Sequence, residues 1–386
     1  MSGLRGGNRI TLLRSGGEYF PALLAAIEAA QHEILLETYI FRPDAVGRRV
    51  AGALSAAVFR GVRVRLMVDG FGGRDFVREL LDDLAADGVE VVVYRREFQL
   101  LLMRRHRLRR LHRKLGVVDG RVAFVGGINI VDDLDGVTHG HPRFDFAVQV
   151  EGPLVADVHQ AMVRLWRLVL WASLKRRFVP LRWVRPDRTP RGTLRARFVM
   201  RDNLRHRRAI EEAYLAAIDG AREQILLANA YFFPGRALRH ALMDAAGRGV
   251  QVTLLLQGRV EYWLLHHACR ALYPPLLAAG VRIVEYRKSF LHAKVAVVDG
   301  RWATVGSSNI DPFSLLLARE ANVVLEDAGF AAELQGALEA AIADGGEPVS
   351  MAHWQRQRWW QRATAWLAYG ILRLLLGVAG YARRLK

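Results

Sequence analysis

The stretch HRKLGVVDGRVAFVGGIN occupies residues 112–129, and HAKVAVVDGRWATVGSSN occupies residues 292–309. Both follow the pattern H-x-K-x4-D-x6-G-[G/S]-x-N, and the second copy begins 180 residues after the first. Alternation along a strand places the His and the Lys on one face. Apolar residues then continue the strand into a core, and an Asp-Gly turn leads to a second short strand. Each copy therefore predicts a β-hairpin with polar groups at one rim.

The similarity between the two halves of the chain extends beyond these hairpins. Residues 25–41 resemble residues 216–232, residues 60–70 resemble 248–258, and residues 88–95 resemble 280–287. Each segment contains an apolar strand pattern, and helical patterns lie between the strands. This order predicts an α/β fold with two α/β/α sandwich domains, whose mixed central sheets form a pseudo-twofold pair.

Length and composition suggest how the chain divides. A chain of 386 residues suits two domains. We predict a first domain at 1–177, a linker rich in Pro and Arg at 178–195, a second domain at 196–348 and a C-terminal helical segment at 349–386. The single cysteine, Cys269, excludes an internal disulfide framework and a multi-cysteine metal site. The formal net charge of +18 predicts an anionic partner, either nucleic acid or anionic lipid.

The C-terminal segment is long and apolar, and Arg373 is the only charged residue between positions 363 and 382. Twenty helical residues could just cross a hydrocarbon core of ~30 Å. A central Arg would cost about 2.5–3.5 kcal/mol there. Trp359 and Trp360, which precede the segment, suit the headgroup zone. We therefore favour docking on a membrane surface over a membrane span.

The two halves differ just before the motifs. Tyr94 precedes His112 by 18 residues, whereas Tyr286 precedes His292 by six. The extra residues form either a solvated cationic loop or a lip that enters a membrane beside the site. The lip would contact lipid through Leu101, Leu102, Arg104, Arg105 and Arg107. Aromatic residues that end the first strand of each half either line a substrate channel or pack in the core: Tyr39, Phe41, Tyr231 and Phe232.

Two polar rims that face each other would gather two imidazoles, two ammonium groups and two amides. This set suits phosphodiester chemistry without a metal or cofactor: one His attacks phosphorus and the other protonates the leaving alcohol. The lysines would stabilise the charge on the non-bridging oxygens. A structural hairpin with a buried His would explain one copy, but two copies with the same spacing favour a catalytic site. The candidate residues are His112, Lys114, Asn129, His292, Lys294 and Asn309.

These motifs resemble the phospholipase D superfamily, whose signature is a duplicated His-Lys-Asp motif, over residues 8–345. They are most similar to bacterial cardiolipin synthases without N-terminal membrane spans, in which a Gly such as Gly127 replaces the usual Ser. The resemblance implies a phosphatidyl-histidine intermediate, with His112 as nucleophile and His292 as general acid and then base. It also implies an acidic residue downstream of each motif that orients the His of that motif: Asp145 and Glu320. Structural roles are expected for Asp119, Asp299, Gly126, Gly127, Gly306 and Ser307.

The resemblance implies transfer of a phosphatidyl group from one phosphatidylglycerol to another, with release of glycerol. Expected partners are anionic phospholipids (phosphatidylglycerol and cardiolipin) and the membrane surface. Nucleic acid is not expected, because the apolar tail is unusual for a nuclease and no clear stripe of stacking aromatics is present. The alternatives are a phospholipase D that transfers to water, a phosphodiesterase-type nuclease, and a membrane scaffold with an inactive site. Without a signal-peptide pattern, the expected location is the cytoplasmic face of the inner membrane, as a peripheral or monotopic protein.

Overall fold

The computed structural model describes residues 3–95, 109–134, 141–173, 182–202, 205–312, 314, 317–356 and 359–378. The residues predicted to form a membrane-inserted lip lie outside this part of the chain: Leu101, Leu102, Arg104, Arg105 and Arg107.

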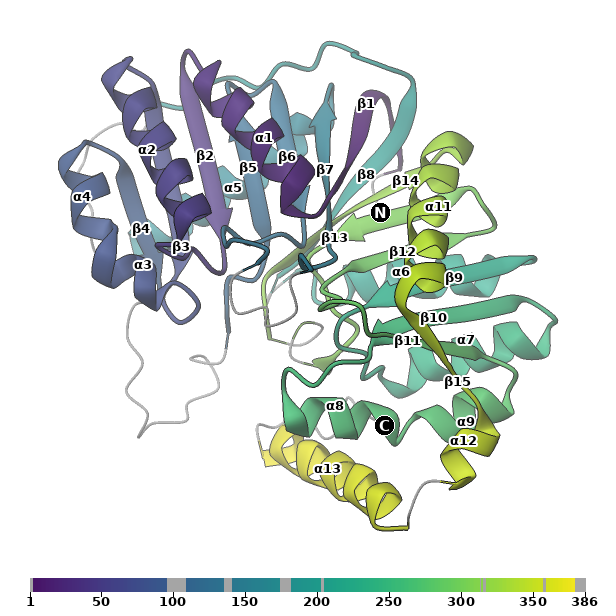
Figure 1. The fold of residues 1–386 in the computed structure, drawn as a ribbon. Helices are drawn as coiled ribbons and strands as arrows, with labels where there is room; N and C mark the ends of the chain where they lie inside the picture. Colours follow the sequence, from purple (N-terminus) through teal and green to yellow (C-terminus); the bar gives the residue numbers. More distant parts are fainter. Residues whose placement is uncertain are drawn as a thin grey trace.

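The first half of the chain builds seven strands of mixed direction. Their order is β1 (Arg5–Arg14), β7 (Phe146–Glu151), β6 (Val122–Gly126), β5 (Lys114–Val118), β2 (Glu33–Thr38), β3 (Arg63–Asp69) and β4 (Glu90–Tyr94). The neighbours β2, β3 and β4 are parallel, and the other pairs are antiparallel. Helices α1 (Ser15–Glu28) and α2 (Ala45–Phe59) cover one face, and α5 (Val155–Ala172) covers the other (Figure 1). The short helices α3 (Arg74–Glu79) and α4 (Leu81–Ala86) connect β3 to β4.

The second half repeats this order. Its strands are β8 (Leu194–Arg201), β14 (Glu320–Glu326), β13 (Trp302–Gly306), β12 (Lys294–Val298), β9 (Gln224–Asn229), β10 (Gln251–Gln257) and β11 (Arg282–Tyr286). An additional strand, β15 (Gly346–Val349), pairs with β11. The helices are α6 (Ala209–Gly220), α7 (Arg236–Gly247), α8 (Trp263–Arg270), α9 (Tyr273–Ala278), α11 (Ala328–Gly345), α12 (Met351–Arg356) and α13 (Trp359–Val378). The prediction of a mixed α/β fold is confirmed.

The two halves join through their first strands. Antiparallel pairing of β1 with β8 makes one 15-stranded sheet. One hydrophobic core contains Val155 and Val158 of α5 together with Leu334 and Leu338 of α11, so the halves share buried surface. Of the predicted linker, residues 182–193 contain no helix or strand. The predicted domain boundaries stay a prediction.

The C-terminal helix α13 lies along α8 (Figure 1). Ala368 and Leu372 of α13 pack in one hydrophobic cluster with Ala268 of α8 and Leu272, which follows α8. The opposite side of α13 is exposed and apolar; this α13 apolar face consists of Trp366, Leu367, Ile371, Leu374 and Leu375. Among the residues that the structure describes, no helix has both the length and the apolar character needed to cross a membrane.

Candidate active site

Each motif forms a tight β-hairpin. The turn residues Asp119 and Gly120 have φ of 51° and 63°, and Asp299 and Gly300 have φ of 49° and 57°. Positive φ at both central positions is the geometry of a type I′ turn, which favours Asp-Gly. The Asp119 carboxylate also accepts hydrogen bonds from the amides of residues 31–33, and Asp299 accepts from those of residues 222–224. Each carboxylate therefore ties its hairpin to the start of a neighbouring strand, β2 in the first half and β9 in the second. This contact lies at the end of the hairpin opposite the His and Lys.

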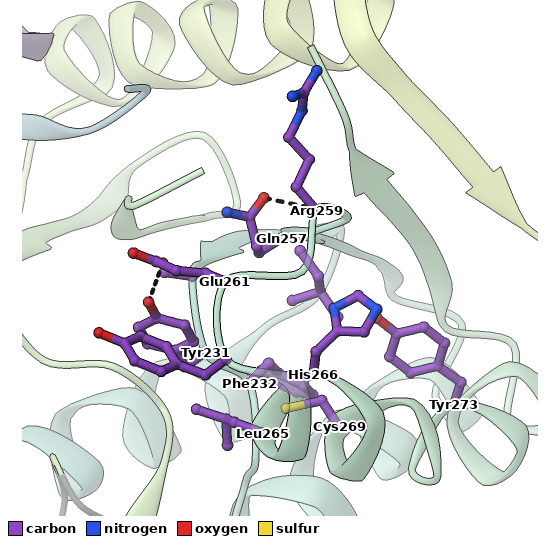
Figure 2. A pocket seen from close by; sticks show the side chains of 12 residues that line it. Tyr231, Phe232, Gln257, Arg259, Glu261, Leu265, His266, Cys269 and Tyr273 are labelled. Atoms are coloured by element: carbon purple, nitrogen blue, oxygen red, sulfur yellow. Dashed lines mark hydrogen bonds between the residues drawn. The ribbon is translucent and has the colours of Figure 1, made fainter. Parts of the chain in front are cut away.

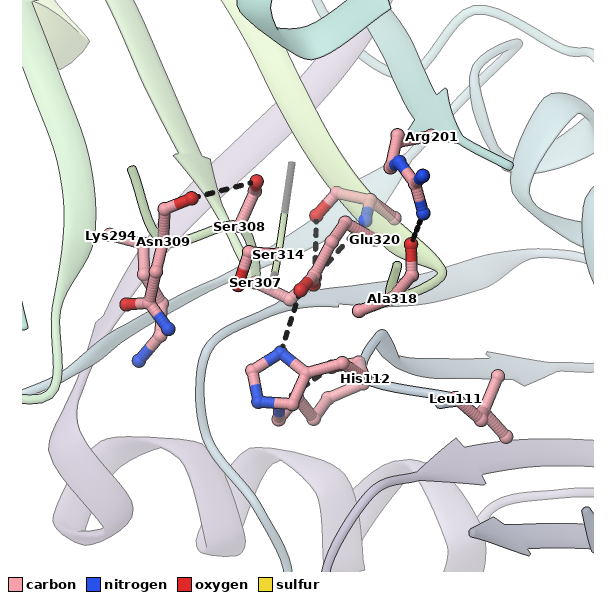
Figure 3. Close-up of polar contacts among 12 residues, drawn as sticks. Leu111, His112, Arg201, Lys294, Ser307, Ser308, Asn309, Ser314, Ala318 and Glu320 are labelled. Atoms are coloured by element: carbon pink, nitrogen blue, oxygen red, sulfur yellow. Dashed lines mark hydrogen bonds and ion pairs between the residues drawn. The ribbon is translucent and has the colours of Figure 1, made fainter. Parts of the chain in front are cut away.

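The two motif histidines pair with carboxylates from the opposite half of the chain. His112 Nδ1 lies 2.9 Å from Glu320 Oε1, and His292 Nδ1 lies 2.6 Å from Asp145 Oδ2. Figure 3 shows the His112 ring pointing at Glu320. The expectation that each carboxylate orients the His of its own motif is therefore wrong. Each catalytic pair exists only when both halves are folded together.

Backbone pairing between the halves explains this exchange. The His112 amide donates to the Arg319 carbonyl at 3.0 Å, and the His292 amide donates to the Phe144 carbonyl at 2.8 Å. Residues 111 and 319 form one isolated parallel bridge, and residues 144 and 291 form another. Each carboxylate is the next residue along the chain after Arg319 or Phe144. The segment that carries it therefore runs beside the His of the other motif.

Both motif lysines are buried next to the histidines. Lys114 Nζ donates to the His112 carbonyl at 2.6 Å, and Lys294 Nζ donates to the His292 carbonyl. Burial lowers the pKa of Lys114 to about 7 and also lowers the pKa of Lys294. The Asp145 carboxylate opposes the second shift, since it lies 3.7 Å from Lys294 Nζ. An ammonium with so little hydration interacts strongly with a bound phosphate oxygen.

The surroundings of the site favour neutral imidazoles and charged carboxylates. Burial lowers the pKa of His112, and burial together with Lys294 lowers the pKa of His292 to about 4. Although burial opposes it, Lys294 and His292 hold the pKa of Asp145 below its usual value. His112 does the same for Glu320. Both rings are therefore neutral at pH 7, and because Nδ1 faces a carboxylate, Nε2 is available for substrate.

The two carboxylates are held differently. Ser307 Oγ donates to Glu320 Oε2 at 2.5 Å, and the Ala321 amide donates to Ser307 Oγ at 3.0 Å. Gly127 has the corresponding place in the first motif, where a Cβ atom would lie only 2.4 Å from Asp145 Oδ1. The shorter Asp145 thus occupies space that a Ser side chain would need. The preceding glycines, Gly126 and Gly306, lie against the backbone of Ala147 and the side chain of Asn322, respectively.

The motif asparagines lie three residues after the second strand of each hairpin. Asn129 Oδ1 accepts from the Ile40 amide at 3.1 Å, which ties the motif to the end of β2. The Asn309 side chain is buried, and its Oδ1 has no hydrogen-bond partner within the described ranges. In the second half, the Ile310 amide instead donates to Asn229 Oδ1 at 3.1 Å.

The four aromatic candidates separate into two kinds. The Tyr39 ring lies 4.8 Å from the His112 ring and 5.5 Å from Lys114 Nζ, and the Tyr231 hydroxyl donates to Glu261. Phe41 and Phe232 are almost fully buried. Both pack in the hydrophobic cores of their halves, which favours the second alternative, core packing, for these two residues.

Sequence reasoning missed three polar residues beside His292. They are Glu261, Arg143 and Gln257. Glu261 Oε1 lies 3.6 Å from Arg143 Nη1. Gln257 Oε1 accepts a hydrogen bond from the Leu291 amide at 3.3 Å. None belongs to the motif. A residue-by-residue comparison of the halves could have found Glu261. The corresponding position in the first half is Gly73, so the acid is a difference between two otherwise similar segments. In the described ranges, no group of three or more His, Cys, Asp or Glu side chains could hold a metal ion.

Comparisons with known proteins agree with this geometry. A family model described as cardiolipin synthase, PLD-like domain, matches residues 23–134 and 214–342. The chain is 39% identical over 377 residues to cardiolipin synthase B of Escherichia coli K12, covering 98% of this chain and 91% of that protein. It is 32% identical over 378 residues to cardiolipin synthase A of Erwinia tasmaniensis, covering 94% and 75%.

A solved structure shares the fold. The phosphatidylserine synthase of Haemophilus influenzae Rd KW20 matches with a TM-score of 0.70 at 13% sequence identity, over 97% of this chain and 95% of that chain. The resemblance to the phospholipase D superfamily and to bacterial cardiolipin synthases is confirmed by the family model and by the identity to these relatives. This chain belongs to the family of cardiolipin synthases with a phospholipase D-like domain.

Proposed function

We propose that this protein is a cardiolipin synthase, which transfers the phosphatidyl group of one phosphatidylglycerol to a second and releases glycerol. The observation that carries this proposal is the pair of imidazole–carboxylate contacts, exchanged between the halves, beside two buried lysines. Family membership supports the same activity. The substrates are anionic phospholipids, and the lysines complement their phosphate charge.

The first half-reaction forms a covalent intermediate. His112 Nε2 attacks phosphorus of the donor, and the bond between phosphorus and the glycerol oxygen breaks. His292 protonates that oxygen, and glycerol leaves. Glu320 supports the positive charge that develops on the His112 ring. Because an anionic phosphate lies next to it, His292 holds a proton more readily in the complex than in the free enzyme.

The second half-reaction reverses these roles. A hydroxyl of a second phosphatidylglycerol gives its proton to His292, and its oxygen attacks phosphorus. The bond between phosphorus and His112 Nε2 breaks, so cardiolipin forms and the neutral imidazole returns. Asp145 orients the His292 ring in both steps. The matching strand orders support a pseudo-twofold axis through the site, with one His on each side of phosphorus.

The same proposal places the protein on the cytoplasmic face of the inner membrane, as a peripheral or monotopic protein. The α13 apolar face supports this placement, because five large apolar side chains on one side of a helix are exposed. Trp359 and Trp360 are exposed at the start of the same helix and suit the headgroup zone. The net charge of +18 attracts the protein to anionic lipid.

The first test is incubation of the detergent-solubilised protein with headgroup-labelled and acyl-labelled phosphatidylglycerol in the presence of a chelator. We expect cardiolipin and free glycerol in equal amounts, and neither product from His112→Ala. Phosphatidic acid alone would identify a phospholipase D that transfers to water. Absence of any lipid product, together with plasmid cleavage, would contradict the proposal and identify a nuclease.

A further inference from the structure

A small pocket lies between the ends of β9 and β10 and helix α8 (Figure 2). Its free volume is about 20 Å³, which is room for one water-sized group. Its polar lining includes Gln257, Glu261, Tyr231 and His266, together with Arg259, Tyr262 and Tyr273, and we call it the hydroxyl pocket. None of these residues belongs to the duplicated motif.

Gln257 brings an unused hydrogen-bond donor to this pocket. Its Oε1 accepts from the amides of Leu291 at 3.3 Å and Arg259 at 3.4 Å, which assigns the other amide atom as nitrogen. That Nε2 atom is buried and has no partner among the described residues. A buried donor without a partner is costly, and its presence indicates that a ligand or water supplies the acceptor.

Glu261 brings an acceptor to the same pocket. The Tyr231 hydroxyl donates to Glu261 Oε2, and Arg143 Nη1 lies 3.6 Å from Oε1. These two contacts fix the carboxylate while part of its side chain stays exposed. A carboxylate has more acceptor sites than these contacts use. A hydroxyl group matches the pocket, because it can donate to Glu261 and accept from Gln257.

The pocket adjoins the His292 side of the active site. Gln257 holds the amide of Leu291, the residue just before His292. The residues that hold Glu261 are also close to catalytic groups along the chain: Arg143 precedes Asp145 by two residues, and Tyr231 follows Asn229, which pairs with Lys294 in the sheet. The charge of Glu261 also contributes to raising the pKa of Lys294, although burial dominates and lowers it.

The first half of the chain keeps only part of this arrangement: Asp69 has the position of Gln257 and accepts from the Leu111 amide at 2.8 Å. In the matching segments, Gly73 replaces Glu261 and Ile40 replaces Tyr231. The asymmetry fits the proposed reaction, in which an alcohol leaves and another enters on the side of the acid–base His. Both alcohols are glycerol headgroups, so microscopic reversibility allows one site to serve both half-reactions.

We propose that the hydroxyl pocket binds a hydroxyl of the glycerol headgroup, in the donor before glycerol leaves and in the acceptor before it attacks. This inference rests on the proposed function. Glu261 and Gln257 are then specificity-determining residues that favour polyols over monohydric alcohols and water. Glu261 and Gln257 bind the alcohol, whereas the motif residues carry out the bond changes at phosphorus.

Exchange of labelled alcohols into phosphatidylglycerol tests this proposal. The enzyme in detergent is given phosphatidylglycerol with either labelled glycerol or labelled propan-1-ol, and each phosphatidyl-alcohol product is measured. We expect the wild type to prefer glycerol. Glu261→Gln keeps the size of the side chain but removes its charge, and should reduce the preference roughly tenfold. Tyr231→Phe, which only loosens the carboxylate, should reduce it less.

Two controls separate the pocket from a structural ion pair. Glu223→Gln makes the same change at an exposed position and should leave the preference unchanged. Arg143→Gln breaks the other contact of Glu261 from outside the pocket and, like Tyr231→Phe, should reduce the preference less than Glu261→Gln does. An unchanged preference in folded Glu261→Gln, or an equal loss in Arg143→Gln, would overturn the proposal. Wild-type protein that forms neither phosphatidyl-alcohol, cardiolipin nor phosphatidic acid would instead contradict the proposed function.

Discussion

The two sides of the active site share their catalytic groups and differ in their surroundings. On the His112 side, an aromatic ring from Tyr39 lies against the imidazole, and Arg74 and Arg110 lie over the ring of Phe71 nearby. On the His292 side, the neighbouring residues include an acid, Glu261, held by a tyrosine.

The difference shows how a duplicated motif can support an asymmetric reaction. Transfer needs a nucleophile on one side of phosphorus and an acid–base group on the other, but both groups can be imidazoles. The motifs supply two similar imidazoles, and the residues around them then distinguish the sides. Both sides carry arginines, and on the His292 side the partly exposed carboxylate of Glu261 suits hydroxyl groups.

Removal of either motif histidine should have the largest effect on activity. It also tests directly whether the two histidines have different roles. His112→Ala and His292→Ala should each lower cardiolipin synthesis by about 10³-fold or more, because each loses a nucleophile or a proton donor. Only His112→Ala should fail to form the covalent intermediate. Protein denatured in neutral sodium dodecyl sulfate is assayed for bound acyl-labelled lipid. If labelled lipid were bound to His112→Ala and not to His292→Ala, the roles of the two histidines would be the reverse of those assigned here.

Exchange of the residues that flank the carboxylates should have the next largest effect. Gly127→Ser places a Cβ within 2.4 Å of Asp145 Oδ1 and should displace the carboxylate from His292. We expect kcat to fall roughly 100-fold, as for a misplaced catalytic group. Ser307→Gly removes one hydrogen bond to Glu320 and should cost roughly tenfold or less.

A double variant sharpens this test. Gly127→Ser with Asp145→Glu copies the second-half arrangement and should recover part of the loss, which a double-mutant cycle on kcat measures. Equal effects of Gly127→Ser and Ser307→Gly would show that the two carboxylates are held in equivalent ways.

The pH profile should depend on the lysine of the His112 side. Burial lowers the pKa of Lys114 to about 7, so the free enzyme carries this charge below pH 7 and loses it above. Because kcat/KM reports groups of the free enzyme, kcat/KM for phosphatidylglycerol should decrease as pH rises through 7. Lys114→Arg should remove the step near pH 7, because a guanidinium stays protonated, and should leave the dependence on the lowered pKa of His292 in place. A flat wild-type profile from pH 6 to pH 9 would contradict the assignment.

Changes on the α13 apolar face should have the smallest effect on catalysis in detergent. Leu367→Glu and Ile371→Glu place charges on exposed positions, so we expect folding and detergent activity to be kept. Flotation with vesicles that contain phosphatidylglycerol should show roughly tenfold weaker binding for each change. Gln361→Glu, an exposed change outside this face, controls for added charge. Unchanged flotation of both variants would remove α13 from the membrane contact.

Much of this protein could be predicted from the sequence because the repeated patterns are local. Apolar periodicity and Asp-Gly turns predict the strands and hairpins of both halves, and the spacing within each hairpin places His and Lys at one rim. The duplication predicts that the two rims form one site. Glu320 and Asp145 could be named as candidates because the resemblance to the phospholipase D superfamily implies an acidic residue downstream of each motif.

The tertiary structure alone decided which groups meet across the halves. Backbone pairing of residues 111 with 319 and 144 with 291 places each carboxylate on the opposite His, and no local pattern encodes such a contact. The same holds for Phe41 and Phe232, whose burial depends on the helices packed over them, and for Glu261, which meets Arg143 only after the halves join. Sequence periodicity determines elements and faces, whereas the exchange of partners between the halves is set by long-range packing.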